Sequence, residues 1–497
     1  MNNKWWILAA MTSCISMIFI DITVLPVALP TIERLLGISE TGLHWIVNAY
    51  TLALTVLVLP GGRLGDMLGH RKVFFWGLTM FALFSALCGL SNSGWWFIAS
   101  RALQGVGGAL LLPCTTAILM DAFPYKERGK AMGIYIGVGS IFLATGPFVG
   151  GIFTQYVSWR LVFWINVPIA LIGFILAYFS VPRTPGKKES FDVRGFLTLS
   201  LGVSAIVVAL MEADVWSWSS PLTLGLLALG LVLLALLIYV DRHAEKPYID
   251  FSLFKERTFL GTLIAIFCTQ FMIMLTVFWS IYFQTGLDFS PAKSGWLSLL
   301  GNSPLIITAP LGGYLLDRFG PRVPITIGFC LVLGALFFFY QVYDTGSIPL
   351  ILASVIPFGC GIPMIITPCM TSALQHTPVH KRGLASGTLV MLRQLGSTLG
   401  LAVFGSLFLS RMHINLIKSF AQNPDTASVA PEQFTGILAK TPSAVTALEQ
   451  FPEAVQGFIT KSFELANNSA FAVINLLGIA VMFVGFLAAL FLIKKNA

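Results

Sequence analysis

The stretch GRLGDMLGHRK, residues 62–72, separates two apolar segments and returns in altered form as GGYLLDRFGPR, residues 312–322. Both copies follow the pattern G-x-x-x-D-x-x-G-x-R. A second pair, FPYKERGKAMG at 123–133 and TPVHKRGLASG at 377–387, shares Pro, Arg-Gly, Ala and Gly at nearly the same displacement. Two independent matches at one displacement indicate that the chain contains a duplicated unit.

The composition decides which solvent surrounds this duplicated chain. Hydrophobic residues make up 56% of its 497 residues and charged residues only 10%, with a mean hydropathy of +0.83. Such a composition excludes a soluble globular protein. Apolar segments of about 20 residues, the length that crosses a bilayer core, recur along the chain. We count fourteen, the last two at 383–410 and 469–493, which predicts an all-α membrane protein.

The positive charges predict the orientation in the membrane. Most of the 30 Lys and Arg residues lie on the N-terminal side, and only Arg34, Arg160 and Lys293 lie in the opposite short loops. Because short basic loops stay in the cytoplasm and the number of spans is even, we expect both termini to be cytoplasmic. This predicts a multi-pass protein of the bacterial cytoplasmic (inner) membrane. The net charge of +8 is explained by contact with the lipid bilayer, so we expect no nucleic-acid partner.

The duplication pairs the first six predicted helices with the last six and leaves two helices between them. We predict an N-terminal six-helix bundle at 1–183, a linker with helices 7 and 8 at 184–257, and a C-terminal bundle at 258–497. The C-terminal bundle includes an extracytoplasmic loop at 411–467. Residues of this loop recur at helical spacing: Val455, Phe458, Ile459, Ser462, Phe463 and Ala466. We expect an amphipathic helix there that lies on the outer leaflet.

Four further motifs occur along the chain: DITVLPVALPTI (21–32), RALQGVGG (101–108), GSIFLATGPFVGG (139–151) and WRLVFWINVP (159–168). Together with residues 62–72 they resemble the motifs of the major facilitator superfamily, and in detail those of its fourteen-helix drug:proton antiporter branch. The resemblance covers essentially the full chain and implies the major facilitator fold. Pro26 departs from the branch, which usually carries Asn there, so a polar contact expected from helix 1 is missing.

The loop at 62–72 has a mechanical and a functional interpretation. We expect Gly62 to permit close helix approach and Gly69 to permit a tight turn. The resemblance implies that Asp66 faces the N-terminus of helix 13 and latches the two bundles together, because backbone N–H groups there attract an anion. Arg71 and Asp121 would complete a charge relay. The alternative is a loop that only fixes topology.

The helix 5 motif contains Gly146, Pro147, Gly150 and Gly151. Small residues let helices pack closely in lipid, and packing alone would explain them. Proline removes a backbone N–H and bends a helix unless neighbours compensate. The resemblance implies that this bend belongs to antiporters, where it seals the bundle interface against leakage.

Asp21 is the one acidic residue placed deep in a predicted span, in the outer half of helix 1. Arg101 has a comparable depth in helix 4. Because an unpaired charge in the membrane is costly, we expect each to face the bundle interior and to influence the other. A static ion pair is one interpretation. The other is proton coupling, since burial favours a protonated carboxyl group and a nearby cation favours the carboxylate.

A substrate cavity is predicted near the middle of the membrane, lined by Asp21, Gln104, Asn48 and Arg393. Arg393 has no obvious carboxylate partner in the sequence. It can contact backbone carbonyls, Gln394 or an anionic part of a substrate, and these alternatives stay open.

The predicted function is proton-coupled export of hydrophobic, cationic drugs by alternating access. The same fold exporting a metabolite, siderophore or lipid is the alternative. A membrane-embedded enzyme or receptor is a remote one, because neither a metalloprotease motif nor a Ser/His/Asp set is found. We expect no enzyme activity, no metal and no cofactor, with the proton gradient as energy source. Small-molecule substrate and protons are the expected partners, the protein would work as a monomer, and a periplasmic adaptor protein is left open.

Overall fold

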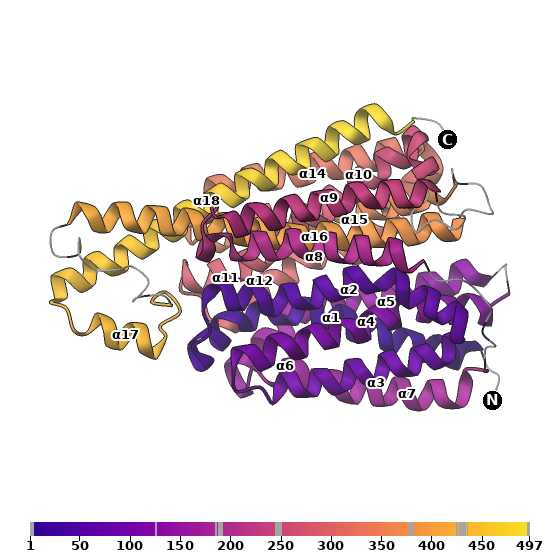
Figure 1. Cartoon of the computed structure of the whole chain (residues 1–497), viewed down its shortest axis with the longest axis horizontal. Helices are drawn as coiled ribbons and strands as arrows, with labels where there is room; N and C mark the ends of the chain where they lie inside the picture. Colours follow the sequence, from indigo (N-terminus) through magenta and orange to yellow (C-terminus); the bar gives the residue numbers. More distant parts are fainter. Residues whose placement is uncertain are drawn as a thin grey trace.

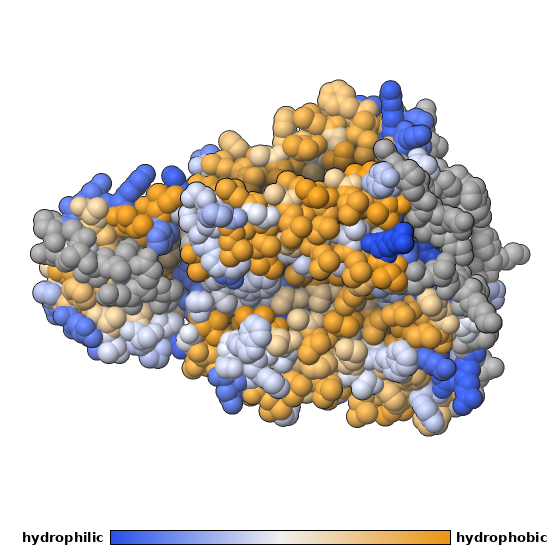
Figure 2. Space-filling model, in the orientation of Figure 1, coloured by the Kyte–Doolittle hydropathy of each residue, from blue (hydrophilic) through white to orange (hydrophobic). Residues whose placement is uncertain are grey.

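The computed structural model describes residues 4–124, 127–183, 186, 192–243, 251–375, 377, 382–423, 426, 434 and 436–494. Within these residues every regular element is a helix, and fourteen helical segments are long and apolar enough to cross a membrane. The predicted all-α class and the number of spans are therefore confirmed. Figure 2 shows apolar side chains over the middle of the molecule and hydrophilic ones at its two ends.

Two groups of helices lie side by side, each built from one end of the chain (Figure 1). The first bundle contains α1 (Lys4–Leu36), α2 (Glu40–Leu68), α3 (His70–Gly89), α4 (Gly94–Ala122), α5 (Arg128–Ile152), a π-helical turn η2 (Phe153–Val157), α6 (Leu161–Trp164) and α7 (Asn166–Ser180). Between the bundles in the sequence come α8 (Val193–Trp216) and α9 (Pro221–His243).

The second bundle follows a short helix η3 (Phe251–Lys255). It contains α10 (Arg257–Ile273), α11 (Leu275–Thr285), α12 (Pro291–Asn302), α13 (Leu305–Phe319), α14 (Arg322–Val342), η4 (Tyr343–Thr345), α15 (Ile348–Gln375), α16 (Arg382–Gln422), α17 (Pro442–Leu448) and α18 (Glu453–Leu492). The start of α1 and the end of α18 lie at the same end of the molecule, which we call the inner end (Figure 1).

The bundles meet along two seams, α2 against α16 and α5 against α12. In the first seam the hydroxyl groups of Thr55 and Thr398 lie 2.8 Å apart. In the second seam a Cβ at Gly295 would overlap the carbonyl oxygen of Pro147, so the two backbones are in direct contact. Helix α8 covers the first seam and contacts both α2 and α16. Small residues and paired hydroxyls are what lipid-embedded helices use to associate.

The two copies of the repeated loop have the same backbone form. Gly69, between α2 and α3, has a φ of 95°, and Gly320, between α13 and α14, has a φ of 77°. Side-chain-bearing residues rarely adopt such angles, so glycine is needed to end each helix in a tight turn. The turn predicted at Gly69 is thus observed.

Prolines account for two interruptions inside predicted spans. A proline clashes with the carbonyl of the residue four positions earlier and lacks an N–H donor. Pro168 lies four residues after Trp164, where α6 ends, and α7 starts at Asn166. Pro304 separates α12 from α13 in the same manner. The first interruption turns Asn166 toward the interior of the first bundle, where it takes part in the site below.

The sequence prediction was wrong about the outer end of the second bundle. Helix α16 continues to Gln422 and α18 already begins at Glu453, so both extend beyond the membrane as a protruding pair (Figure 1). The apolar face of residues 455–466 does not lie on the leaflet. It packs on α16, where the rings of Phe420 and Phe463 lie 6.3 Å apart. A neighbouring apolar helix face covers this surface, so lipid is not needed to cover it.

Candidate functional site

The centre of the first bundle contains a buried ion pair between α1 and α4. Arg101 Nη1 donates a hydrogen bond of 2.7 Å to Asp21 Oδ2. Both residues are only 1% exposed. The mutual influence expected from their depth in the sequence is therefore a direct contact.

Two amides complete the coordination of the Asp21 carboxylate. Gln104, one turn after Arg101 on α4, donates to Oδ1 at 2.9 Å. Asn166, at the start of α7, donates to the same oxygen at 2.8 Å. Asn166 also donates to Ser85 Oγ on α3 at 3.0 Å. The carboxylate thus connects α1, α4 and α7 through one ion pair and two amide hydrogen bonds.

The guanidinium of Arg101 is equally well satisfied. Its Nε donates to the carbonyl oxygen of Ile46 on α2 at 3.1 Å, and Nη1 also donates to Gln104 Oε1 at 2.7 Å. The guanidinium carbon lies 4.3 Å from the centroid of the Tyr50 ring, within range of a cation–π interaction. Removing one partner of such a pair leaves an uncompensated buried charge, at a cost of about 3–5 kcal/mol.

The four residues predicted to line a substrate cavity are only partly brought together. Asp21 and Gln104 share the hydrogen-bond network just described. Asn48, on α2, is fully buried and its Oδ1 accepts from Thr51, but its Nδ2 has no partner. Arg393 lies on α16 in the other bundle, is half-buried, and its Nε has no hydrogen-bond partner. No described hydrogen bond joins Asn48 or Arg393 to Asp21.

The predicted latch residues lie at the inner end. Asp66 Oδ1 is 3.2 Å from His70 Nε2, one turn further along the chain. Arg71 donates to the carbonyl oxygen of Tyr178 at 2.9 Å, and Asp121 is exposed at the end of α4. The first side chains of α16, which the latch would contact, lie outside the described residues. The latch therefore stays a prediction.

The loop glycines differ from expectation in one respect. A Cβ at Gly62 would lie 3.4 Å from Pro113 Cβ, which is ordinary van der Waals contact. The close approach expected there occurs one residue earlier, at Gly61, where a Cβ would overlap the carbonyl oxygen of Ala109. The face that α2 turns toward α4 is thus shifted by one residue from the predicted one.

The helix 5 motif packs in two directions. A Cβ at Gly146 or Gly150 would overlap residues of α1, while a Cβ at Gly151 would overlap the carbonyl oxygen of Pro291 on α12. Pro147 contacts Gly295, also on α12. One motif therefore positions α5 both within its own bundle and against the other. Its sealing role remains a prediction.

The sequence of this protein, which forms two bundles of spanning helices with a repeated loop, matches the model of one protein family. The model of the Major Facilitator Superfamily matches residues 11–401. The chain belongs to this superfamily. It is a multi-pass membrane protein, and the superfamily to which it belongs consists of small-molecule transporters.

Individual Major Facilitator Superfamily proteins resemble the chain over most of their length. Multidrug resistance protein Stp of Mycobacterium tuberculosis is 33% identical, over 78% of this chain and 73% of Stp. The tetracenomycin C resistance and export protein of Streptomyces glaucescens is 31% identical, over 83% of this chain and 77% of that protein. A bacterial homologue of the human lysosomal transporter Spinster has the same fold, with a TM-score of 0.68, 15% identity and coverage of 99% and 98% of the two chains.

Several residues around Asp21 in this Major Facilitator Superfamily protein were not singled out from the sequence. Asn166 lies within the motif WRLVFWINVP and Tyr50 lies between ordinary helix residues of α2. An amide two residues before a proline in a span was the signal for Asn166, because buried amides need partners. No such signal marked Tyr50, whose role depends on the packing of α2 against α4.

Proposed function

We propose that the protein is a proton-coupled exporter of hydrophobic, cationic drugs, which works by alternating access in the bacterial cytoplasmic membrane. The observation that carries the proposal is the Asp21–Arg101 pair in a chain whose relatives are named for drug resistance and export. The proton gradient supplies the energy and no cofactor takes part. One chain contains both bundles, so the exporter works as a monomer.

The buried carboxylate gives the coupling a physical basis. When a proton binds Asp21, the attraction to Arg101 and the charge assistance of the amide hydrogen bonds are lost together. The contacts that join α1, α4 and α7 then weaken. Because packed helices shift between discrete arrangements, protonation changes which arrangement is favoured. Asp21 is sealed in the arrangement described here, so proton exchange takes place in another one.

Transport by purified protein in proteoliposomes tests the proposal. We expect an imposed proton gradient to drive accumulation of hydrophobic cations, and substrate addition to release protons. The substrate panel contains cationic drugs, neutral drugs, siderophores, lipids and small metabolites, so it also separates drug export from the metabolite alternative. Gradient-independent flux for every compound would overturn proton coupling, and movement of metabolites alone would overturn the drug assignment.

A further inference from the structure

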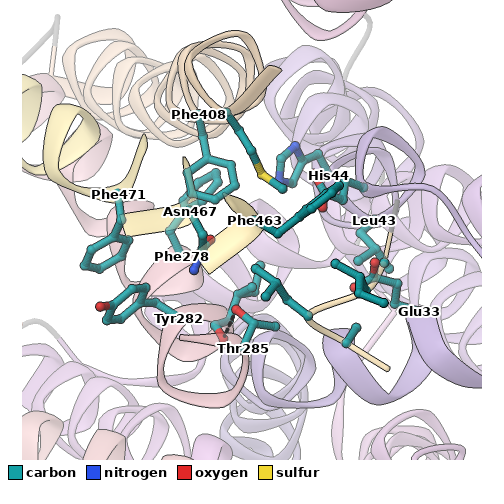
Figure 3. Close-up of a pocket in the computed structure, with 17 residues that line it drawn as sticks. Glu33, Leu43, His44, Phe278, Tyr282, Thr285, Phe408, Phe463, Asn467 and Phe471 are labelled. Atoms are coloured by element: carbon teal, nitrogen blue, oxygen red, sulfur yellow. Dashed lines mark hydrogen bonds between the residues drawn. The ribbon is translucent and has the colours of Figure 1, made fainter. Parts of the chain in front are cut away.

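A pocket lies between the two bundles at the outer end (Figure 3). Its residue Glu33 is about 18 Å further along α1 than Asp21. The first bundle contributes α1 and α2, and the second contributes α11, α16, α18 and the segment 436–439. Its volume is about 40 Å³, room for a few water molecules in this arrangement. Because its walls belong to different bundles, the pocket widens when the bundles separate at this end.

The wall from the first bundle is acidic. Glu33 is only 5% exposed, and Glu40 is close enough for the two charges to interact. His44 lies beside them, on the next turn of α2 (Figure 3). None of the described residues that line the pocket is Lys or Arg. Two neighbouring carboxyl groups in a pocket wall, with no Lys or Arg among its described lining residues, favour a cationic occupant.

The opposite wall is aromatic. Phe278, Phe408, Phe463 and Tyr282 line it, and Figure 3 shows the aromatic and acidic walls on opposite sides of the pocket. The Nδ2 of Asn467, which also lines the pocket, is buried without a hydrogen-bond partner. Buried polar groups are normally satisfied, so this amide donor is a second, independent sign that the pocket takes up a molecule with an acceptor atom, such as the hydration water of an occupant.

Residues 436–439, which precede α17, form one side of the pocket. Gly436 has a φ of 85°, and a Cβ there would lie 3.2 Å from Glu33 Oε1. The segment is tied to the loop after α11 by an exposed ion pair of 3.0 Å between Lys440 and Asp288. Exposed pairs of this kind are weak, so this side of the pocket can open.

We propose that this pocket is an outer binding site for an organic cation, occupied as the substrate leaves the exporter. Carboxylates neutralise the charge and aromatic faces attract it, which is the chemistry that recognises quaternary ammonium and phosphonium groups. A metal ion fits poorly, because one wall consists of hydrocarbon rings. The inference rests on the proposed function for its substrate class, but the site can be tested without transport.

The experiment measures protection of a reporter cysteine in the pocket. Thr285→Cys in right-side-out vesicles is labelled from outside by a membrane-impermeant maleimide, with the unsubstituted protein as background. We expect tetraphenylphosphonium to slow labelling, and neutral triphenylphosphine oxide to leave it unchanged. Adding Glu33→Gln should raise, at least tenfold, the tetraphenylphosphonium concentration that gives half-maximal protection. Glu464→Gln is the control. It removes an exposed carboxylate from α18, next to the pocket residue Phe463, and should leave the protection unchanged.

Phe408→Leu keeps an apolar side chain but removes a ring from the opposite wall, and we expect weaker protection by the cation there as well. Equal protection in Glu33→Gln and Glu464→Gln, or no protection at any concentration, would overturn the site. Neither result depends on proton-driven transport. An exporter that moves drugs normally without this protection would refute the outer site alone, whereas protection without any proton-coupled flux would refute the proposed function alone.

Discussion

Asp21 and Arg101 are joined at 2.7 Å between α1 and α4, with side chains that are 0% and 1% exposed. Their ion pair is the most deeply enclosed charge interaction among the described residues of the first bundle. Any proton that reaches Asp21 must therefore disturb the packing of three helices. This makes the pair the first place to test how proton binding and transport are connected.

Asp21→Asn should abolish substrate-induced proton release and spare downhill movement of neutral compounds. Asparagine keeps the shape and one acceptor but cannot bind the transported proton. Arg101 then lacks a counter-charge, so lower thermal stability is also expected. Proton release on substrate addition, followed across pH in purified protein, is the measurement. Unchanged proton release would remove Asp21 from the mechanism.

Arg101→Ala should hold Asp21 in its protonated form at neutral pH, because the buried carboxyl group loses the cation that favours its charge. Active export should collapse, and any remaining proton release should move to higher pH. Arg318→Ala is the matched control, since Arg318 is exposed on α13 and its contacts are with its neighbours Tyr314 and Phe319. A wild-type pH profile in Arg101→Ala would reduce the pair to a structural role.

Asn166→Ala should move the pH profile of transport in the same direction as Arg101→Ala, but by a smaller amount. It removes one neutral donor from Asp21, and hydrogen bonds to charged groups contribute about 1.5–3 kcal/mol. We expect the pH profile of transport to move upward by roughly one unit, which corresponds to about 1.4 kcal/mol. Ser85→Ala removes the other partner of Asn166 without touching Asp21 and should leave the profile in place.

Asp66→Asn should impair transport while leaving substrate affinity largely intact. Asp66 lies at the inner end beside His70, on the predicted latch between bundles, where it biases the conformational equilibrium. The measurements are the substrate Kd in detergent and the transport rate in proteoliposomes, each compared between the unsubstituted protein and Asp66→Asn. Loss of binding with normal alternating access would exclude the latch.

Gly295→Leu should force α5 and α12 apart at the outer end, because even a Cβ at this position overlaps Pro147. Transport should fall, and the population with an open outer end should rise. Gly137→Leu, on the facing helix α5, is the control, since a Cβ at Gly137 meets nothing within 4 Å.

The distance between spin labels on Tyr156 and Asp288, both exposed at the outer end, measures the separation. A background with the exposed Cys330 replaced by serine avoids stray labelling. The same distance distribution in Gly295→Leu and Gly137→Leu would show that the seam tolerates the added bulk.

The Asp21–Arg101 contact was predictable because two isolated charges at similar depth in a membrane have strong reason to pair. The turn at Gly69 was predictable for an equally local reason, since glycine permits the backbone angle that ends the helix there. Asn166 could not be assigned, since its contact with Asp21 depends on where Pro168 interrupts the helix. Glu33 lies near the end of α1, where the sequence alone gives no sign that it is buried. Its burial depends on residues 436–439, far away in the sequence.

The amphipathic pattern of residues 455–466 was recognised, but not what covers it. Periodicity reports that one face of a helix is apolar, and it does not distinguish lipid from protein as the covering material. The partner is an extension of α16 that follows a membrane span. Such pairings between helices distant in sequence require the tertiary structure.

Helices α16 and α18 pass without interruption from the second bundle into the protruding pair, and α16 runs about 18 Å past the expected end of its span at residue 410. An unbroken helix is stiff, so its two ends move together when the helix rotates. A small tilt of the second bundle is therefore magnified at the tip, near Gln422. A fluorophore attached near Gln422 would lie on the cell exterior. Its signal would report the steps of the transport cycle while the transporter works.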